Sequence, residues 1–477
     1  MLGVHMKKQN LKTYVLIALI ISSVVLTGKI WFNEKLWPEG YNFFAVITDN
    51  FSFGDDDFVS SLTKETISFP QTLVVTNTEK RSVYAADSDS FKAMVPDVKE
   101  LLRLALESND KTAIGEQDWS QALKTQSIHV TYPVAYDSKL FLNILGSYKT
   151  DDNSIPVKEF IISSSNFAAT GADVYIRRYD TAEIFKTSVT WERQRLADMI
   201  NTYALDSIGD FSYSSELNFD KADTSAGAQQ KVLIESNVLI LLNQRLSHML
   251  EEFNPLYHHE FNADVVDSLL TQFGYNVSGA RKYTERDNSI VFVENYSTLK
   301  LHPNGLVEYK AVDASKGIDL GSGNDFYEGL LGCVDFVNRM WGEVLPSEAL
   351  NINISSDVID TKTNSFRLTM DYFADGAQVS IDLPQSTSHQ SMNHGVEIEV
   401  VGGKIVLYRQ VLAYFESIDM ATNGTSAIEA LDKLMAGSNM EGQVIRNLYP
   451  VYIADGTSYR KSAWAARTAD GRTVIIN

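Results

Sequence analysis

The sequence is poor in cysteine, with Cys333 the only one among 477 residues. A single cysteine excludes a disulfide within the chain and excludes zinc or iron–sulfur sites built from several thiolates. Packing and hydrogen bonds must therefore hold the fold together. Cys333 lies in an apolar stretch, 326–334, that we expect to be helical, where a free thiol behaves as a small buried hydrophobic group.

Positive charge is also scarce. The chain has 41 Lys and Arg against 61 Asp and Glu, a formal net charge of −20. Phosphate backbones are bound by clustered basic residues, so this balance argues against a nucleic-acid partner. With 44% hydrophobic and 21% charged residues, the chain is long enough and apolar enough to form two or three globular units.

Signatures of catalysis and of metal or cofactor binding are missing. The sequence has no G-x-S-x-G elbow, phosphate-binding Walker loop or dinucleotide fingerprint. Two S-x-x-K matches, at Ser61 and Ser458, lack the S-D-N and K-T-G motifs that accompany them in penicillin-binding enzymes. The acidic run 55–57 and the pair His258 and His259 lack calcium-loop and zinc-motif spacing. We therefore predict no catalytic, cofactor-binding or metal-binding residues.

One long apolar run is present, at 13–32, and it has the roughly 20 residues that a bilayer core requires. Lys7, Lys8 and Lys12 precede it, which predicts a cytoplasmic tail at 1–12 and an extracytoplasmic location for the rest of the chain. Tyr14 and Trp31 suit the two membrane interfaces. A cleaved signal peptide is the alternative, but no small-x-small cleavage site follows the run.

The outer part begins with a mixed α+β domain at 33–213. Short β-branched runs predict strands at 72–76, 82–85, 127–132, 160–163 and 173–178. Apolar residues at one-face spacing predict one helix that opens at Pro96 and another at 191–203. The next segment, 214–255, is predicted to be a polar linker followed by an amphipathic helix at 231–250.

The remaining chain predicts two repeated units, each with a helix and an antiparallel sheet, at 256–320 and 321–477. Hairpin turns are expected at four dipeptides: Asn304-Gly305, Asp375-Gly376, Gly402-Gly403 and Asp470-Gly471. One-face apolar stripes predict helices at 265–273 and 326–340, and a Ser426-x-x-Glu429 capping box opens a third. The fold class is thus α+β, with one N-terminal transmembrane helix.

Small and hydroxylated residues recur at four-residue spacing in the predicted span: Ala18 with Ser22, and Ser23 with Thr27. In lipid, such residues allow helices to approach closely and to hydrogen-bond one another, so they are candidates for contact with a partner helix. The alternative is that the hydroxyls bond carbonyls of their own helix.

A second group of partner-contact candidates lies near the C-terminus: Arg460, Lys461, Trp464 and Arg467. Arginine together with aromatic residues is typical of the core of a protein interface. The same pattern also fits the solvated face of a hairpin or the filling of a sheet.

The chain resembles the YycH family of Gram-positive bacteria. The resemblance rests on the basic N-terminus, the single span at 16–31 and the length of the outer part. It also rests on the ending at 449–456 and 464–477, which is similar to the closing strands of YycH, YycI and PepSY-like domains. The segment 51–57 matches nothing in the family. Membership implies a membrane-anchored regulator that acts with a YycI-like paralogue on a WalK-type sensor histidine kinase controlling cell-wall metabolism, with no catalytic residues to transfer.

The rival interpretation is an anchored cell-envelope hydrolase or a ligand-binding receptor ectodomain. Either would have a deep cleft with convergent polar groups and carboxylates of perturbed pKa. A regulator would instead have filled cores and a broad interaction surface.

Overall fold

The computed structural model describes residues 67–476, apart from 79, 86–87, 148–153, 165–169, 205–209, 218–231, 243–245, 247, 257–260, 295, 322–325, 345–351, 356–364, 387–388, 419–423, 437–441 and 455–457. The predicted span at 13–32 and the segment 51–57 lie outside these residues. Among the helices that are described, none is long and apolar enough to cross a membrane.

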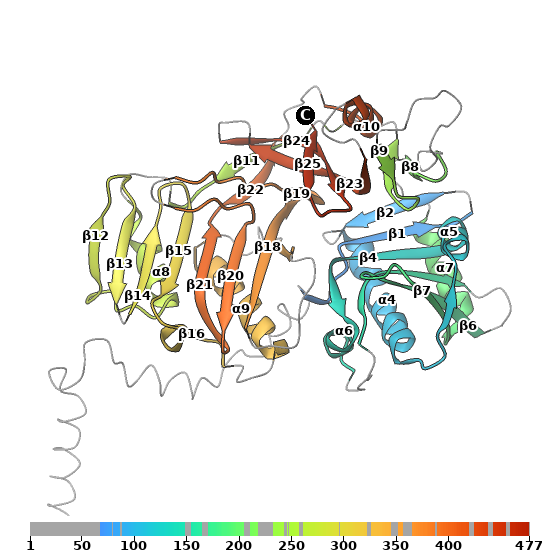
Figure 1. Ribbon diagram of the computed structural model, residues 1–477, viewed down its shortest axis with the longest axis horizontal. Helices are drawn as coiled ribbons and strands as arrows, with labels where there is room; N and C mark the ends of the chain where they lie inside the picture. The colour runs from blue at the N-terminus through green and yellow to red at the C-terminus, as the bar shows by residue number, and fades with distance from the viewer. Residues whose placement is uncertain are drawn as a thin grey trace, which may run out of the picture.

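The N-terminal lobe, residues 67–204, is built on a seven-stranded sheet of order β2-β1-β4-β5-β6-β7-β3 (Figure 1). Its paired strands are all antiparallel. The strands are β1 (Thr72–Thr76), β2 (Arg81–Ala85), β3 (Thr112–Ile114), β4 (Ser127–Asp137), β5 (Pro156–Ser164), β6 (Thr170–Arg178) and β7 (Ile184–Glu192). The helices are α4 (Asp89–Glu107), α5 (Glu116–Lys124), α6 (Ser138–Ile144) and α7 (Arg193–Tyr203).

Alternation along the strands separates two faces of this sheet. Leu73 and Val75 of β1 face the main core, together with the apolar sides of α4, α6 and α7. Val74, between them, belongs to a smaller cluster on the opposite face, where Trp119 of α5 is fully buried. The part of that opposite face beyond α5 is left to line a cavity.

The second lobe, residues 261–418, and a cap above both lobes share one large sheet (Figure 1). The strands of the second lobe are β12 (Arg281–Thr284), β13 (Ile290–Glu294), β14 (Ser297–Leu301), β15 (Leu306–Ala311), β16 (Ile318–Asp319), β17 (Ile352–Ile354), β18 (Phe366–Ala374), β19 (Ala377–Val379), β20 (Val396–Val401), β21 (Lys404–Val411) and β22 (Tyr414–Ile418). Its helices are α8 (Ala263–Gln272), α9 (Phe326–Val344) and the 3₁₀ turn η2 (Ala314–Lys316).

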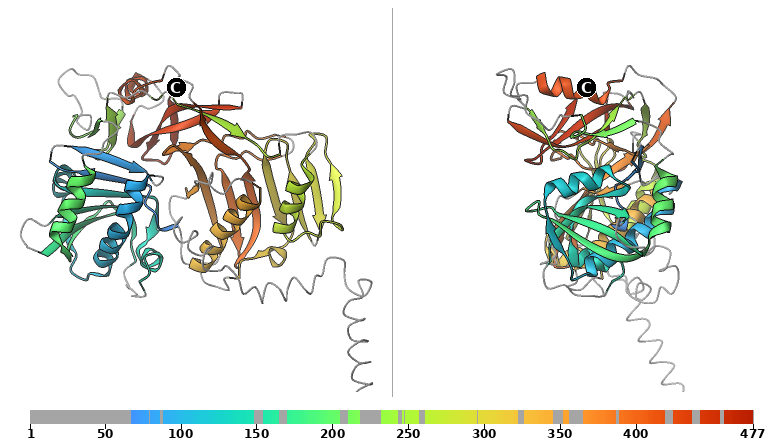
Figure 2. Two further views of the ribbon diagram at one scale, coloured as in Figure 1. Left: turned by 180° about the vertical axis from the view of Figure 1, so that it is seen from behind. Right: turned by 90° about the vertical axis from the view of Figure 1, so that its right-hand side faces the viewer.

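Both long helices of the second lobe cover the same face of the sheet (Figure 2). Phe273, at the end of α8, and Phe336 of α9 each contact the ring of Tyr408, at centroid distances of 5.6 and 5.1 Å. Cys333 of α9 is fully buried, as expected for a hydrophobic filler, and burial raises the pKa of its thiol. This face is therefore a packed core.

The cap is assembled from two distant parts of the chain. It contains β9 (Val232–Ile234), β11 (Met249–Phe253), α10 (Ala427–Ala436), β23 (Gln443–Ala454), β24 (Tyr459–Thr468) and β25 (Thr473–Ile476). β9 pairs in parallel with β23, and β11 pairs with both β22 and β24. A separate two-stranded sheet of β8 (Asp210–Tyr213) and β10 (Leu239–Leu242) lies between the cap and the N-terminal lobe.

The local turn and cap predictions are confirmed. Each of the four predicted dipeptides joins two paired strands, and six of their residues have positive φ: Gly305, Asp375, Gly376, Gly402, Gly403 and Gly471. Both hydrogen bonds of the predicted capping box at Ser426 and Glu429 are present, at 3.0 and 3.2 Å. These signals are local, so the sequence alone sufficed.

Two local predictions are wrong. The amphipathic helix expected at 231–250 is not formed, because the described residues there are strands β9 and β10 and the start of β11. Short apolar runs fit a buried strand as well as a helix, and here distant strands provide the pairing. The helix expected to open at Pro96 begins instead at Asp89, since Ser88 caps it by accepting a hydrogen bond from the Phe91 backbone N–H at 3.3 Å.

Candidate functional site

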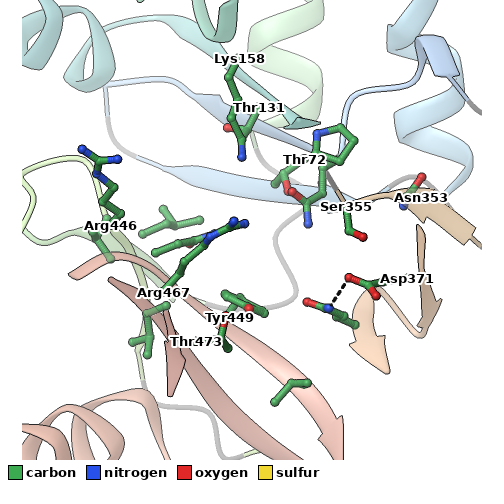
Figure 3. A pocket seen from close by; sticks show the side chains of 18 of the residues that line it. Thr72, Thr131, Lys158, Asn353, Ser355, Asp371, Arg446, Tyr449, Arg467 and Thr473 are labelled. Atoms are coloured by element: carbon green, nitrogen blue, oxygen red, sulfur yellow. Dashed lines mark hydrogen bonds between the residues drawn. The ribbon is translucent and has the colours of Figure 1, made fainter. Parts of the chain in front are cut away.

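A cavity of about 1060 Å³ lies between the N-terminal lobe and the wall formed by the cap and the second lobe (Figure 3). On one side it is lined by the outward face of β1, β4, β5 and β6, including Thr72, Val74 and Thr131. On the other side are β17, β18 and β19, the connection 380–395, and β23, β24 and β25. Strand alternation explains which residues line the cavity, since their neighbours on the same strands face the lobe cores.

The cavity is lined by charged residues of both signs, and its acidic residues are Glu159, Glu235, Asp371 and Asp382. Several of its cations also have carboxylate partners: Arg177 contacts Glu116 at 3.0 Å and Arg446 contacts Glu235 at 3.0 Å. Both walls of the cavity contribute basic residues: Lys158, Arg177 and Arg178 come from the N-terminal lobe, and Arg446 and Arg467 come from the cap.

Lys158 and Arg467 come from opposite walls and point into the same space (Figure 3). The ammonium of Lys158 lies 5.5 Å from the centre of the Tyr179 ring. Beside Arg467, burial raises the pKa of Tyr449, although a hydrogen bond with Thr473 and the arginine charge oppose that rise. An anion placed between the two walls would be attracted from both sides.

A polar cluster occupies the wall formed by the second lobe. His394 Nδ1 lies 3.0 Å from Oδ1 of the buried Asp371 and 3.3 Å from Ser355 Oγ. The amide of Gln378 donates to the other Asp371 oxygen at 2.8 Å. A Ser–His–Asp triad needs the aspartate and the serine on opposite ring nitrogens. Here both contact the same nitrogen, so this cluster orients side chains and is not arranged to activate Ser355.

The His394 side chain gives the cluster a pH-dependent charge. Burial disfavours the imidazolium, but the hydrogen bond and negative charge of Asp371 outweigh burial and raise the pKa of His394 above its usual 6.5. Because the folded-state pKa is raised, the stability this group adds is fully present below about pH 6.5 and is lost as pH rises through the raised value.

Replacing Asp371 with asparagine is therefore expected to lower the pKa of His394 by about one pH unit or more, because the opposite charge is removed. An NMR titration of the histidine ring protons, with His394→Gln to assign the resonance, measures the change. The matched control is Asp319→Asn, because the Asp319 side chain is 67% exposed and lies at the far side of the second lobe. An unchanged His394 pKa in Asp371→Asn would contradict this account.

A buried charge network lies on the sheet face opposite α8 and α9. Arg409 of β21 donates to Glu308 of β15 and to Glu397 of β20, each at 3.0 Å. Its guanidinium also donates to the carbonyls of Gln390 and Ser391, at 2.7 and 3.2 Å. Arg409 thus fixes the connection 380–395 to the sheet, and this connection carries His394 to the cavity.

The four C-terminal residues predicted as partner contacts differ in burial. Arg460 is 6% exposed and bound to Glu252 at 2.9 Å, and Trp464 is 2% exposed and donates to the Thr425 carbonyl at 2.9 Å. Both are structural parts of the cap. Lys461 and Arg467 are half-buried, which leaves them as the members of the set that another molecule could reach.

The other predicted contact residues, Ala18, Ser22, Ser23 and Thr27, lie outside the described residues, as do His258 and His259. Within the described part of the chain, no group of three or more His, Cys, Asp and Glu side chains is placed to hold a metal ion.

Sequence reasoning missed the cavity residues Lys158, Asp371 and His394. They come from β5, from β18 and from the loop before β20, so no spacing along the chain joins them. The available signal was a polar residue on the outward face of a strand whose alternate residues are apolar. That signal predicts which face of a strand is polar, but it does not predict which other part of the chain lies opposite that face.

Comparison with known proteins gives one informative result. No protein-family model matches the chain, and no curated protein sequence matches it. A solved structure does: the crystal structure of YycH from Bacillus subtilis superposes with a TM-score of 0.54 and 11% sequence identity, covering 87% of this chain and 97% of that chain. At this identity the likeness establishes the fold, so the chain has a YycH-like, mixed α/β fold, and the resemblance noted from the sequence is confirmed at that level.

Proposed function

We propose that this chain, with its YycH-like fold, is a single-pass membrane-anchored regulatory protein that modulates a WalK-type sensor histidine kinase through protein contacts. The observation that carries the proposal is the fold likeness over 87% of the chain. The apolar run at 13–32 and the three lysines before it support an anchor with the outer domains outside the cytoplasm. A YycI-like paralogue is the proposed second partner.

Such a protein acts by binding one signalling state of the kinase better than the other, since only a difference in affinity shifts an equilibrium. In the proposed arrangement, Ala18, Ser22, Ser23 and Thr27 contact a kinase helix within the membrane. Lys461 and Arg467 are the half-buried members of the C-terminal set, and Arg467 lines the cavity between the lobes. No chemical step is required of the chain.

An anchored ligand-binding ectodomain is the second candidate, and the large cavity between the lobes favours it. The two functions are compatible, because a ligand that fixes the lobes would alter the surface presented to a kinase. The hydrolase alternative gains no support from Ser355, whose contact with His394 uses the nitrogen already bound to Asp371.

Replacing Ala18 and Ser22 with leucine is expected to reduce recovery of the kinase with the tagged full-length chain from membranes by about tenfold, since bulky residues separate the helices. Kinase phosphorylation in the same membranes should change in parallel. The control is Ile17→Leu with Ile21→Leu, which changes the face of the same helix that is turned away from all four candidate residues.

Unchanged recovery in the Ala18 and Ser22 variant would remove the proposed helix contact. If the unmodified chain recovers no kinase and its deletion leaves kinase phosphorylation unaltered, the regulatory function itself is wrong.

A further inference from the structure

The cavity is large enough for a short segment of polymer. Pockets for small molecules usually measure about 300–1,000 Å³, and this cavity, at about 1060 Å³, is comparable to the largest of them. Its lining includes apolar side chains, among them Val74, Ile354 and Phe373, as well as the lysine and arginine side chains described above. A ligand that fits this lining carries apolar and acidic groups together.

Two strands that line the cavity offer backbone groups for pairing. Among the described residues, β17 pairs only with β18, and β25 pairs only with β24. Residues of both strands line the cavity, and the side chain of Ile475 of β25 is 38% exposed. An edge strand is a template for an added strand, because its outward N–H and C=O groups pair with another peptide backbone.

Two cations that face each other across the cavity favour an acidic peptide, although Glu159, Glu235, Asp371 and Asp382 also line it. Lys158 and Arg467 reach into the cavity from opposite walls (Figure 3), and Arg446 lines the same wall as Arg467. Carboxylates make charge-assisted hydrogen bonds with lysine and arginine that are about twice as strong as neutral ones. A phosphate polymer would satisfy these cations but would leave the strand edges and Ile475 without a matching partner.

We propose that the cavity between the lobes binds an extended acidic peptide segment of a partner protein, which pairs with an exposed strand edge and places carboxylates between Lys158 and Arg467. Such a peptide would contact both walls and so hold the N-terminal lobe against the cap. The proposal does not depend on which kinase, if any, the chain regulates.

The test is a selection of displayed random heptapeptides on the purified full-length chain, counter-selected on the Lys158→Gln, Arg467→Gln double variant. The expected result is enrichment of peptides with at least two acidic residues next to apolar ones. Fluorescence anisotropy of an enriched peptide should show binding at least about tenfold weaker to the double variant. Backbone N-methylation of the peptide, which removes its pairing N–H groups, should also weaken binding.

Two controls separate this result from general charge attraction and from misfolding. The variant Lys92→Gln, Arg286→Gln removes one lysine and one arginine at exposed positions away from the cavity and should bind as the unmodified chain does. The Arg467→Lys variant keeps the charge and should retain more binding than Arg467→Gln, with melting temperatures confirming that each variant is folded.

Three outcomes would overturn the proposal. One is no enrichment beyond that on the double variant, and another is an enriched pool without acidic residues. The third is tighter binding of a short polyphosphate than of the acidic peptides together with indifference to N-methylation, which would assign the cavity to a phosphate polymer instead.

Discussion

Replacing Arg409 with methionine is expected to lower the free energy of unfolding by about 3–5 kcal/mol, because two carboxylates would remain buried without their shared cation. The Arg409 and Glu397 side chains are only 6% and 7% exposed, and the Glu308 side chain is 20% exposed. The substitution also removes the two donors that hold the carbonyls of Gln390 and Ser391. Chemical denaturation of the full-length chain, followed by tryptophan fluorescence, measures the loss.

The matched control is Arg367→Gln, which removes the other arginine bound to Glu397. The Arg367 side chain is 64% exposed, so its loss should change the free energy of unfolding by less than about 1 kcal/mol. Equal effects of the two substitutions would show that burial of the Arg409 pairs does not determine their contribution.

The effect of Arg409→Met should also depend on pH. Burial alone would raise the pKa of Glu308, but its hydrogen bond with His302 and the charges of His302 and Arg409 hold that pKa below its usual range. A carboxylate with a lowered folded-state pKa adds stability above its unfolded pKa of about 4.3 and loses it as pH falls through the folded value. The difference between Arg409→Met and the unmodified chain should therefore shrink below about pH 4.

Replacing Trp464 with alanine is expected to lower the free energy of unfolding by about 3–5 kcal/mol, the usual result of emptying a large buried site. Trp464 lies in a cluster that joins α10 to the strands of the cap, and its indole N–H is hydrogen-bonded to the Thr425 carbonyl. Trp464→Phe should cost less, since it keeps most of the apolar volume. Thermal and denaturant unfolding of the two variants measure the difference.

Tyr296→Ala is the control for loss of an aromatic side chain, because Tyr296 is 69% exposed and should change stability by no more than about 0.5 kcal/mol. A small effect of Trp464→Ala would indicate that this side chain is accessible, as a partner contact requires. A large effect means that any loss of partner binding in this variant follows from damage to the cap.

Features set by neighbours in sequence were predictable. The turn at Gly402-Gly403 and the cap at Ser426 depend on the conformation of a few adjacent residues. The strand at 72–76 was predicted with its observed bounds, because it is a short β-branched run between turn residues. In these cases local preference and the final fold agree.

Features set by contacts between distant segments were not predictable. The apolar residues of 232–242 carry no mark that distinguishes a strand from a helix, and their state is decided by β23 and β8. Trp464 and Arg460 have the composition of an interface, yet they lie inside the cap because α10 and Glu252 cover them. Likewise, the walls that carry Lys158 and Arg467 meet only through the arrangement of the lobes.

The parallel pairing of β9 with β23 has a consequence for how the polypeptide is made. Glu235, just after β9, meets Arg446 across 211 positions of sequence, so the ribosome must finish nearly the whole chain before this pair can form. Closing such a long loop is slow compared with local hairpin formation. During synthesis, β9 would wait unpaired until β23 is made, and a chain that ended before residue 443 would leave β9 and the β24-facing edge of β11 open to aggregation.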